Sequence, residues 1–161
     1  MVSLGSAAAE LPEPNDLMLS VAKAYVPDMA SLKRYQYAEL DALFIGDTVL
    51  LSLPRGRFRV VYFAEDGVLY TWFPGRDYIG KADFGIVDGA AICVDSVTRP
   101  GAGRAEVTCQ PIEQLTGYIS DRKEGDLFGL SSREAPPWSL LIDSDTISID
   151  AVEASRPDAS E

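Results

Sequence analysis

Apolar and aromatic side chains crowd the segment FRVVYFAEDGVLYTWF, residues 58–73, on both sides of Asp66-Gly67. β-Branched and aromatic residues favour strands and Asp-Gly is a strong turn signal, so the segment predicts a β-hairpin. A two-residue turn places Phe63 opposite Tyr70 and Val61 opposite Trp72, and the other face then carries Val60, Tyr62, Leu69 and Phe73. Because both faces are apolar, we expect one to pack on the domain core and the other under N-terminal helices or against a partner chain.

Helical spacing precedes this hairpin. Residues 17–25 predict a short helix that Asn15 or Asp16 can cap and that Pro27 interrupts. A second helical pattern covers residues 29–43, with Asp28 as its candidate cap. Residues 1–14 are small, apolar or proline-rich, and they predict a flexible arm.

Short apolar runs between turn residues continue the β pattern. We expect strands at residues 48–53, 90–97 and 104–110, and pairing of the last two about residues 98–103 places Cys93 opposite Cys109. Residues 77–89 hold several turn formers and predict a loop that contains at most a short strand, and residues 114–132 are polar and turn-rich. Two late strands are expected at residues 138–142 and 146–152, before a tail without apolar periodicity.

Together these elements predict a mainly β fold, a small antiparallel barrel or sandwich with one or two N-terminal helices. The expected organisation is a flexible arm over residues 1–14 and a single β-rich domain over residues 15–153, whose helices occupy residues 15–43. Residues 154–161 are expected to form a flexible acidic tail.

Charge is uneven along this chain of 161 residues, whose net charge is −11. Residues 1–54 carry 7 acidic and 3 basic side chains, residues 55–111 carry 7 of each, and residues 112–161 carry 11 acidic and 4 basic side chains. The acidic balance opposes direct binding of nucleic acid and favours solubility or a basic partner. We expect a protein partner or a homo-oligomer, with no direct nucleic-acid contact.

The sequence lacks residues that several common catalytic and metal-binding mechanisms require. Histidine is absent, which removes histidine bases, histidine-containing triads and histidine metal ligands. Cys93 and Cys109 are too few for a zinc site and are interpreted as two buried thiols, and no phosphate-binding glycine motif occurs. We therefore expect no cofactor and no metal. The sequence has neither an apolar run long enough to cross a membrane nor a secretory signal pattern, so its location is expected to be cytoplasmic or within a virion.

The segment LLIDSDTI, residues 140–147, is the stretch most like a catalytic motif. It partly resembles the signature of aspartic proteases, with Asp145 where that family has glycine, and the Asp-x-Asp loop of haloacid dehalogenase-type phosphatases. Asp143, Asp145, Asp150 and Glu153 could also surround a cation, although their spacing departs from an EF-hand loop. A hairpin turn, in which Asp and Ser side chains bond to their own backbone, is the favoured interpretation.

Two groups of residues are candidates for an interface. Arg55, Arg57 and Arg59 alternate and would share one face of a strand, where they could meet phosphate or an acidic surface such as the C-terminal third of another copy. Tyr70, Trp72, Phe73, Arg76 and Tyr78 cluster in sequence, and these residue types are common anchors of protein interfaces. The alternatives are a solvated strand end for the arginines and the domain core for most of the aromatic residues.

These observations favour a non-enzymatic interaction or assembly component, for example a structural or accessory subunit of a viral or phage particle. A small acidic inhibitor, such as an immunity or anti-defence protein, is the first alternative, since the acidic C-terminal third could block a basic active site or nucleic-acid groove. A carboxylate-based hydrolase that uses Asp143 or Asp145 is the second.

Overall fold

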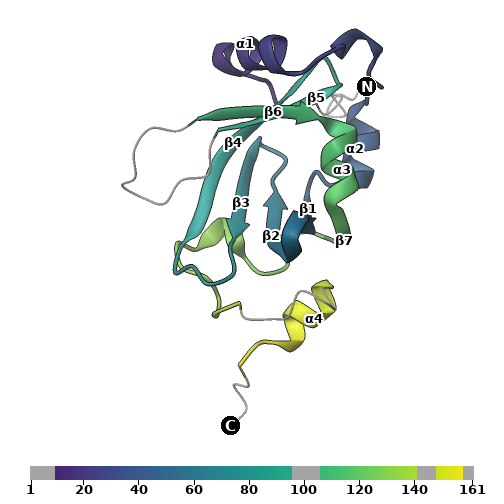
Figure 1. Ribbon diagram of the computed structural model, residues 1–161. Helices are drawn as coiled ribbons and strands as arrows, with labels where there is room; N and C mark the ends of the chain where they lie inside the picture. Colours follow the sequence, from purple (N-terminus) through teal and green to yellow (C-terminus); the bar gives the residue numbers. More distant parts are fainter. Residues whose placement is uncertain (1–9, 96–105, 141–147, 158–161) are drawn as a thin grey trace, which may run out of the picture.

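The structure, a computed structural model, describes residues 10–95, 106–140 and 148–157 (Figure 1). Seven strands form one antiparallel sheet in the order β6-β5-β4-β3-β2-β1-β7, and the sheet curls into a half-barrel. The strands are β1 Asp47–Leu53, β2 Arg57–Phe63, β3 Val68–Trp72, β4 Ile79–Val87, β5 Ala91–Asp95, β6 Val107–Pro111 and β7 Ile119–Glu124. The predicted mainly β class with a helix near the N-terminus is confirmed.

Helices cover the sheet and bridge its edges. They are α1 Asp16–Tyr25, α2 Tyr37–Leu43, α3 Ile112–Tyr118 and α4 Ile149–Ala154, with three short 3-10 turns at Met29–Ser31, Pro54–Gly56 and Leu130–Ser132. Because α3 connects β6 to β7, which lie at opposite edges of the sheet, it crosses the open side of the half-barrel (Figure 1).

The first predicted helix is confirmed: Asn15 caps α1 by accepting a hydrogen bond from the Met18 N–H at 2.8 Å. The second prediction, a helix over residues 29–43, is wrong in extent. Asp28 adopts a left-handed φ of 53°, and the Tyr35 N–H bonds to the Gly89 carbonyl at 2.7 Å rather than to a helical partner. The chain therefore leaves helical geometry between the turn at Met29–Ser31 and α2.

The 58–73 hairpin forms, but its register differs by one residue from the prediction. Tyr62 faces Tyr70 and Phe63 faces Leu69, because the loop has three residues instead of two. Ala64 accepts a hydrogen bond from the Gly67 N–H at 3.2 Å and donates to Val68 at 2.9 Å, with Gly67 left-handed at φ 91°. A one-residue slip exchanges the two faces of a strand, so β3 places Tyr70 and Trp72 on the face opposite to the predicted one.

Other expectations fail where polar residues lie in regular structure. Residues 77–89, expected as a loop, contain the nine-residue strand β4, and the turn-rich segment 114–132 contains most of α3 and all of β7. The expected strand at residues 146–152 is wrong, since residues 149–152 belong to α4, and residues 138–140 form no strand. Residues 141–147 lie outside the described part of the chain.

Both faces of the hairpin are covered, by different parts of the chain. The inner, concave face carries Val61, Phe63 and Leu69, which pack with side chains of α2 and α3. The outer face carries Val60 and Trp72, which pack with C-terminal side chains, namely Phe128, Leu130, Trp138, Leu140, Ile149 and Val152. The expected cover by an N-terminal helix is found on the inner face, at α2, whereas the C-terminal segment covers the outer face.

A disulfide joins Cys93 of β5 to Cys109 of β6, so the prediction of two free thiols is wrong. The predicted register is confirmed, because the two residues are direct partners in the antiparallel ladder. Both sulfur atoms lie under α1, at 3.5 and 3.6 Å from the Met18 carbonyl oxygen. The two cysteine side chains lie on the same face of the sheet, where α1 covers them.

The described ends of the chain are both held by hydrogen bonds, the first to the sheet and the second to the C-terminal segment. Pro12 is buried, and its carbonyl accepts a hydrogen bond from the Ile86 N–H of β4 at 3.0 Å. At the other end, the Ser155 hydroxyl accepts a hydrogen bond from the Trp138 indole at 3.0 Å. The rest of the predicted arm and tail, residues 1–9 and 158–161, lies outside the described residues.

Candidate functional site

A cavity of about 340 Å³ lies on the concave side of the half-barrel, between the sheet and α3. Strand alternation directs every second side chain of β1, β2, β3, β5 and β6 into this space. Its apolar lining is Leu51, Val61, Phe63, Leu69, Phe73, Ile92, Val94 and Leu115. Its polar lining is Arg59, Thr71, Thr108 and Gln110. The lining therefore combines eight apolar side chains with four that can form hydrogen bonds.

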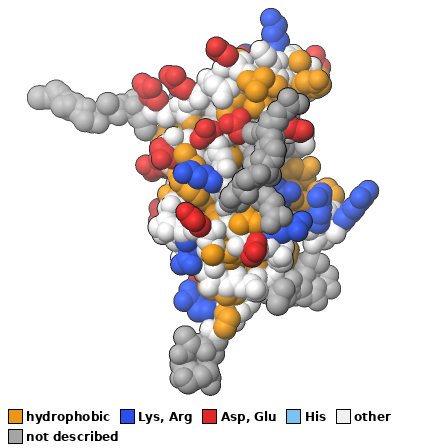
Figure 2. Space-filling view, turned by 90° about the vertical axis from the view of Figure 1, so that its left-hand side faces the viewer, with side chains coloured by type: hydrophobic (Ala, Val, Ile, Leu, Met, Phe, Trp, Pro, Cys, Tyr) orange, Lys and Arg blue, Asp and Glu red, His pale blue; other side chains and the backbone are white. Residues whose placement is uncertain are grey.

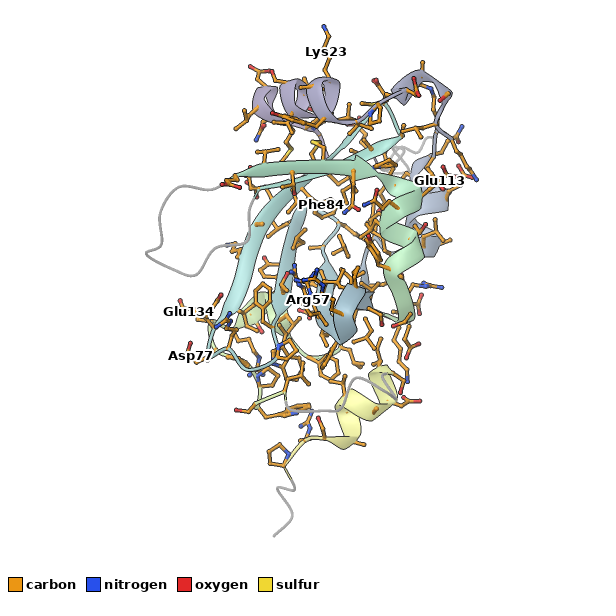
Figure 3. The ribbon with its side chains drawn as sticks, viewed as in Figure 1. Lys23, Arg57, Asp77, Phe84, Glu113 and Glu134 are labelled. Carbon is orange, nitrogen blue, oxygen red and sulfur yellow. A yellow bond between two sulfur atoms is a disulfide. The ribbon has the colours of Figure 1, made fainter. Side chains whose placement is uncertain are left out.

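An adjoining hollow of about 420 Å³ shares Arg59 and Phe73 with the cavity. Arg57, Arg76 and Tyr78 also line it, together with Gly56, Phe58 and Pro74. We call this second space the arginine hollow. Figure 3 shows Arg57 in front of the curled sheet, and Figure 2 shows Lys and Arg side chains projecting from the same side of the molecule, at its right-hand edge.

Local geometry explains how these arginines meet. Arg57 begins β2, and Arg59 follows two residues later on the same face. Arg76 lies in the tight turn between β3 and β4, where its N–H bonds to the Phe73 carbonyl at 3.3 Å. The Arg59 guanidinium lies over the Phe73 ring at 5.1 Å from the centroid, a cation–π contact that holds it at the junction of the two spaces.

The arginines of this region lack acidic partners within the described chain. Ion pairs there join Lys33 to Glu39, Arg122 to Asp47, Lys123 to Asp150 and Arg156 to Glu153. Among the described residues no carboxylate oxygen lies within 4.0 Å of the side-chain nitrogens of Arg55, Arg57, Arg59 or Arg76. Burial, and secondarily the charge of Arg57, lowers the pKa of Arg59 from its usual value. An anion placed there would oppose both effects, because an opposite charge favours the charged guanidinium.

The structure brings together part of the predicted interface set. Arg57, Arg59, Phe73, Arg76 and Tyr78 line the arginine hollow, and Phe73 and Tyr78 lie with ring centroids 5.9 Å apart. Arg55 lies in the 3-10 turn before β2 with a left-handed φ of 69° and does not line the hollow.

Tyr70 and Trp72 lie on the outer face instead, because of the hairpin register. Trp72 is fully buried there, whereas Tyr70 is partly buried and stacks on Tyr62 at 6.1 Å. Sequence reasoning missed the polar side chains of β6 in the cavity, although the alternation of Val107, Thr108, Cys109 and Gln110 carries the signal.

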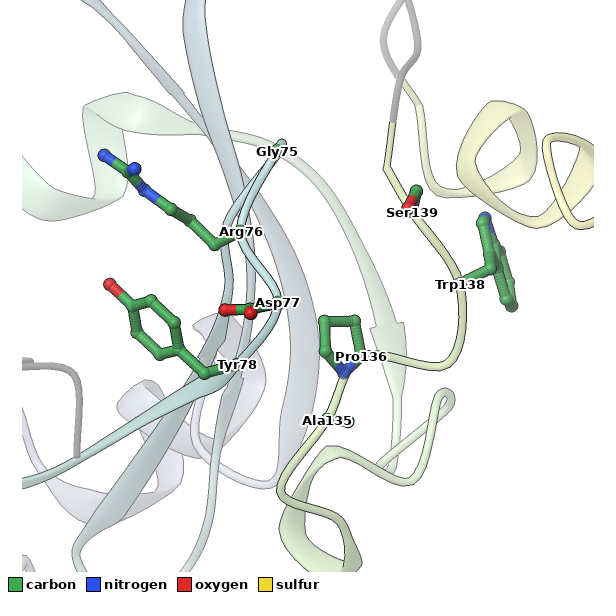
Figure 4. A pocket seen from close by; sticks show the side chains of 8 residues that line it. All are labelled: Gly75, Arg76, Asp77, Tyr78, Ala135, Pro136, Trp138 and Ser139. Atoms are coloured by element: carbon green, nitrogen blue, oxygen red, sulfur yellow. The ribbon is translucent and has the colours of Figure 1, made fainter.

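Two other surface features lack convergent chemistry. A broad depression of about 850 Å³ is lined by Arg76, Asp77, Tyr78, Pro136 and Trp138, but Figure 4 shows Arg76 and Tyr78 pointing away from the segment that holds Pro136 and Trp138. A second depression, lined by Asp41, Asp47, Glu65 and Glu124, contains Arg122, whose Nη1 lies 2.7 Å from Asp47 Oδ2.

No group of His, Cys, Asp or Glu suited to a metal ion occurs among the described residues. Asp143 and Asp145, the candidate hydrolase residues, lie outside that part of the chain. None of the helices in the described ranges has the length and apolar character needed to cross a bilayer. Comparisons with protein-family models, with curated protein sequences and with solved structures find no match to this chain.

Proposed function

We propose that this protein is a non-enzymatic assembly component that associates with further copies of itself through the arginine hollow. The observation that carries the proposal is the set of arginines without acidic partners in a chain of net charge −11. An acidic protein has many carboxylates with which to pair its arginines internally. Arginines without acidic partners that lie next to aromatic side chains are typical of interface anchors.

The occupant we propose is the acidic C-terminal third of a second copy. Residues 112–161 carry 11 acidic and 4 basic side chains, and exposed residues there include Glu113, Glu124 and Glu134. Figure 3 shows Glu113 on α3 and Glu134 at the opposite side of the molecule, so acidic groups are available in several directions. Contact between different surfaces of two copies is head-to-tail, and it generates a ring or an open filament.

Light scattering coupled to size-exclusion chromatography tests this proposal over a range of protein and salt concentrations. We expect oligomers at low ionic strength that dissociate as salt rises, because exposed ion pairs are screened. Arg57→Glu combined with Arg76→Glu should give a monomer. Lys81→Glu with Lys23→Glu is the matched control, since it makes the same charge change at exposed positions outside the hollow. A wild-type monomer at every concentration in low salt overturns the proposal, as does equal association of the two double variants.

A further inference from the structure

The cavity behind Arg59 is partly open to solvent, and its buried wall residues, apart from Thr71, are apolar. Sheet residues from β2, β3 and β5 and Leu115 of α3 contribute its walls, and Phe63, Leu69, Ile92 and Leu115 are buried. The volume of this cavity is about 340 Å³, near the lower end of the range of about 300–1,000 Å³ for ligand pockets. Its size suits a small molecule with a short apolar body rather than a protein segment or a long acyl chain.

The polar side chains of the cavity have hydrogen-bonding capacity to spare. Within the described chain, the side chain of Thr71 makes no hydrogen bond although the residue is only 2% exposed, and the half-buried Arg59 and Gln110 and the exposed Thr108 make none either. Arg59 in addition has no carboxylate partner there. Native proteins pair most buried polar groups, so the buried Thr71 beside the cavity indicates a hydrogen-bonding ligand, and Arg59, Thr108 and Gln110 are accessible donors around it.

Charge decides the type of ligand head group. A single guanidinium faces the cavity, held over the Phe73 ring, and its fork of N–H donors matches the two oxygens of a carboxylate. A multiply charged phosphate would find only one cation, Arg59, among the described residues that line the cavity. A single negative charge with an apolar body fits both the donor set and the lining.

We infer that the cavity between the concave sheet and α3 binds a small amphipathic monocarboxylic acid, whose carboxylate pairs with Arg59 and whose apolar body lies against Leu69, Ile92 and Leu115. Thr71, Thr108 and Gln110 supply neutral hydrogen bonds from the cavity lining. Arg59 and Phe73 line both spaces, but Arg57 and Arg76, which we assign to the partner, line the arginine hollow and not the cavity, so variants distinguish the two proposals.

Isothermal titration calorimetry with decanoate, performed in salt high enough to keep the protein monomeric, tests the site. Decanol is the uncharged comparison, and hexanoate and hexadecanoate probe the cavity size. We expect decanoate to bind at least about tenfold more tightly than decanol, since a charge-assisted hydrogen bond contributes about 1.5–3 kcal/mol. Hexadecanoate should gain nothing over decanoate, because the extra chain does not fit.

Three variants make the assignment specific. Arg59→Gln keeps a long polar side chain, and it should weaken decanoate binding about tenfold or more while leaving decanol binding unchanged. Val94→Phe fills the cavity and should abolish binding of both, provided that circular dichroism and the melting temperature show a folded protein. Arg57→Gln, at the rim but outside the cavity, should leave decanoate binding within about twofold of the wild type.

Two outcomes overturn the inference. One is the absence of decanoate binding at millimolar concentration in the folded wild-type protein. The other is equal loss of affinity in Arg59→Gln and Arg57→Gln, which would indicate attraction to the positive rim alone. Neither result depends on the oligomeric state. The binding experiment can therefore contradict the ligand site without contradicting the assembly proposal, and light scattering can do the reverse.

Discussion

The indole rings of Trp72 and Trp138 meet edge to face with their centroids 5.0 Å apart and an interplanar angle of 89°. Trp72 belongs to β3, and Trp138 belongs to the irregular C-terminal segment that crosses the outer face of the sheet. Phe128 completes the cluster, at 5.3 Å from Trp72 and 5.8 Å from Trp138. This contact fixes the C-terminal segment to the outer face, opposite the face that lines the cavity.

Truncation of Trp138 should therefore destabilise the whole domain. Trp138→Ala removes the packing on Trp72 and Phe128, and we expect it to lower the free energy of unfolding by about 3–5 kcal/mol, measured by urea denaturation. Leu127→Ala is the control, because Leu127 is 39% exposed and should cost little. Equal effects of the two substitutions would show that the C-terminal segment does not depend on the aromatic cluster.

The indole N–H of Trp72 is buried without a hydrogen-bond partner within the described residues. An unpaired buried donor costs about 1–3 kcal/mol. Trp72→Phe removes that donor while keeping an aromatic ring, so it should cost clearly less than Trp72→Ala, which we expect to lose about 3–5 kcal/mol. Thermal unfolding of both variants measures the difference, and equal losses would contradict this account of the indole.

Glycine 85 marks the contact between the N-terminal segment and β4. A Cβ atom at Gly85 would lie 2.6 Å from Pro14 Cα and 3.0 Å from Met18 Sδ. Gly85→Ala should thus lower the melting temperature and expose the N-terminal segment to protease. Gly117→Ala is the matched control, since nothing lies within 4 Å of its added Cβ in α3 and alanine favours a helix by about 0.5–1 kcal/mol. A protease-resistant, fully stable Gly85→Ala variant would refute the contact.

The sequence predicted this fold best where one local signal acted alone. Asn15 capped α1 as expected, and the pairing of Cys93 with Cys109 followed from strand lengths and a symmetric turn. Prediction failed where the same short sequence signal is compatible with more than one backbone geometry. Asp66-Gly67 fits both a two-residue turn and a three-residue loop with Gly67 left-handed, and the difference of one residue decided which face received Trp72.

The candidate site was predictable only in part for the same reason. Arg57 and Arg59 share a face through simple alternation, and the structure places both at the arginine hollow. Their neighbours Thr108 and Gln110 come from β6, whose position depends on the curl of the whole sheet. Non-local curvature has no short sequence pattern, so the cavity itself could be found only in three dimensions.

Reduction of the disulfide should weaken the fold without destroying it. Cys93 and Cys109 close a loop with a sequence separation of 16, for which loop-closure entropy gives about 3 kcal/mol. Urea unfolding with and without a reductant measures the loss. The double variant Cys93→Ala with Cys109→Ala should show no response to the reductant. Two thiols that titrate freely in the native, oxidised protein would exclude the bond.

The contribution of Asp47 to the free energy of unfolding should decrease as pH rises. Burial raises the pKa of the Asp47 carboxyl above its usual value of 3.8, although Arg122 opposes the shift. The folded state therefore holds this proton more tightly than the unfolded state, and the associated stabilisation is present below pH 3.8 and lost as pH rises through the folded pKa. Relative to Asp47→Asn, the wild type should lose stability over that interval in urea titrations at stepped pH. A constant difference between the two proteins across the interval would contradict the shift.

The end of the chain should divide into a stabilising part and a dispensable part. Ser155 accepts the Trp138 indole hydrogen bond at 3.0 Å, and the Arg156 guanidinium lies 4.8 Å from the centroid of the Trp138 ring. Deletion of residues 155–161 leaves the Trp138 donor unpaired and removes a cation–π contact, so we expect a loss of about 1–3 kcal/mol. Deletion of residues 158–161 spares both contacts and should leave the melting temperature unchanged.

If the two truncated proteins are equally stable, Ser155 and Arg156 contribute nothing to the stability of the fold. If the shorter deletion alone reduces oligomer formation at unchanged stability, the terminal acidic residues take part in assembly, as the charge complementarity with Arg57 and Arg76 suggests.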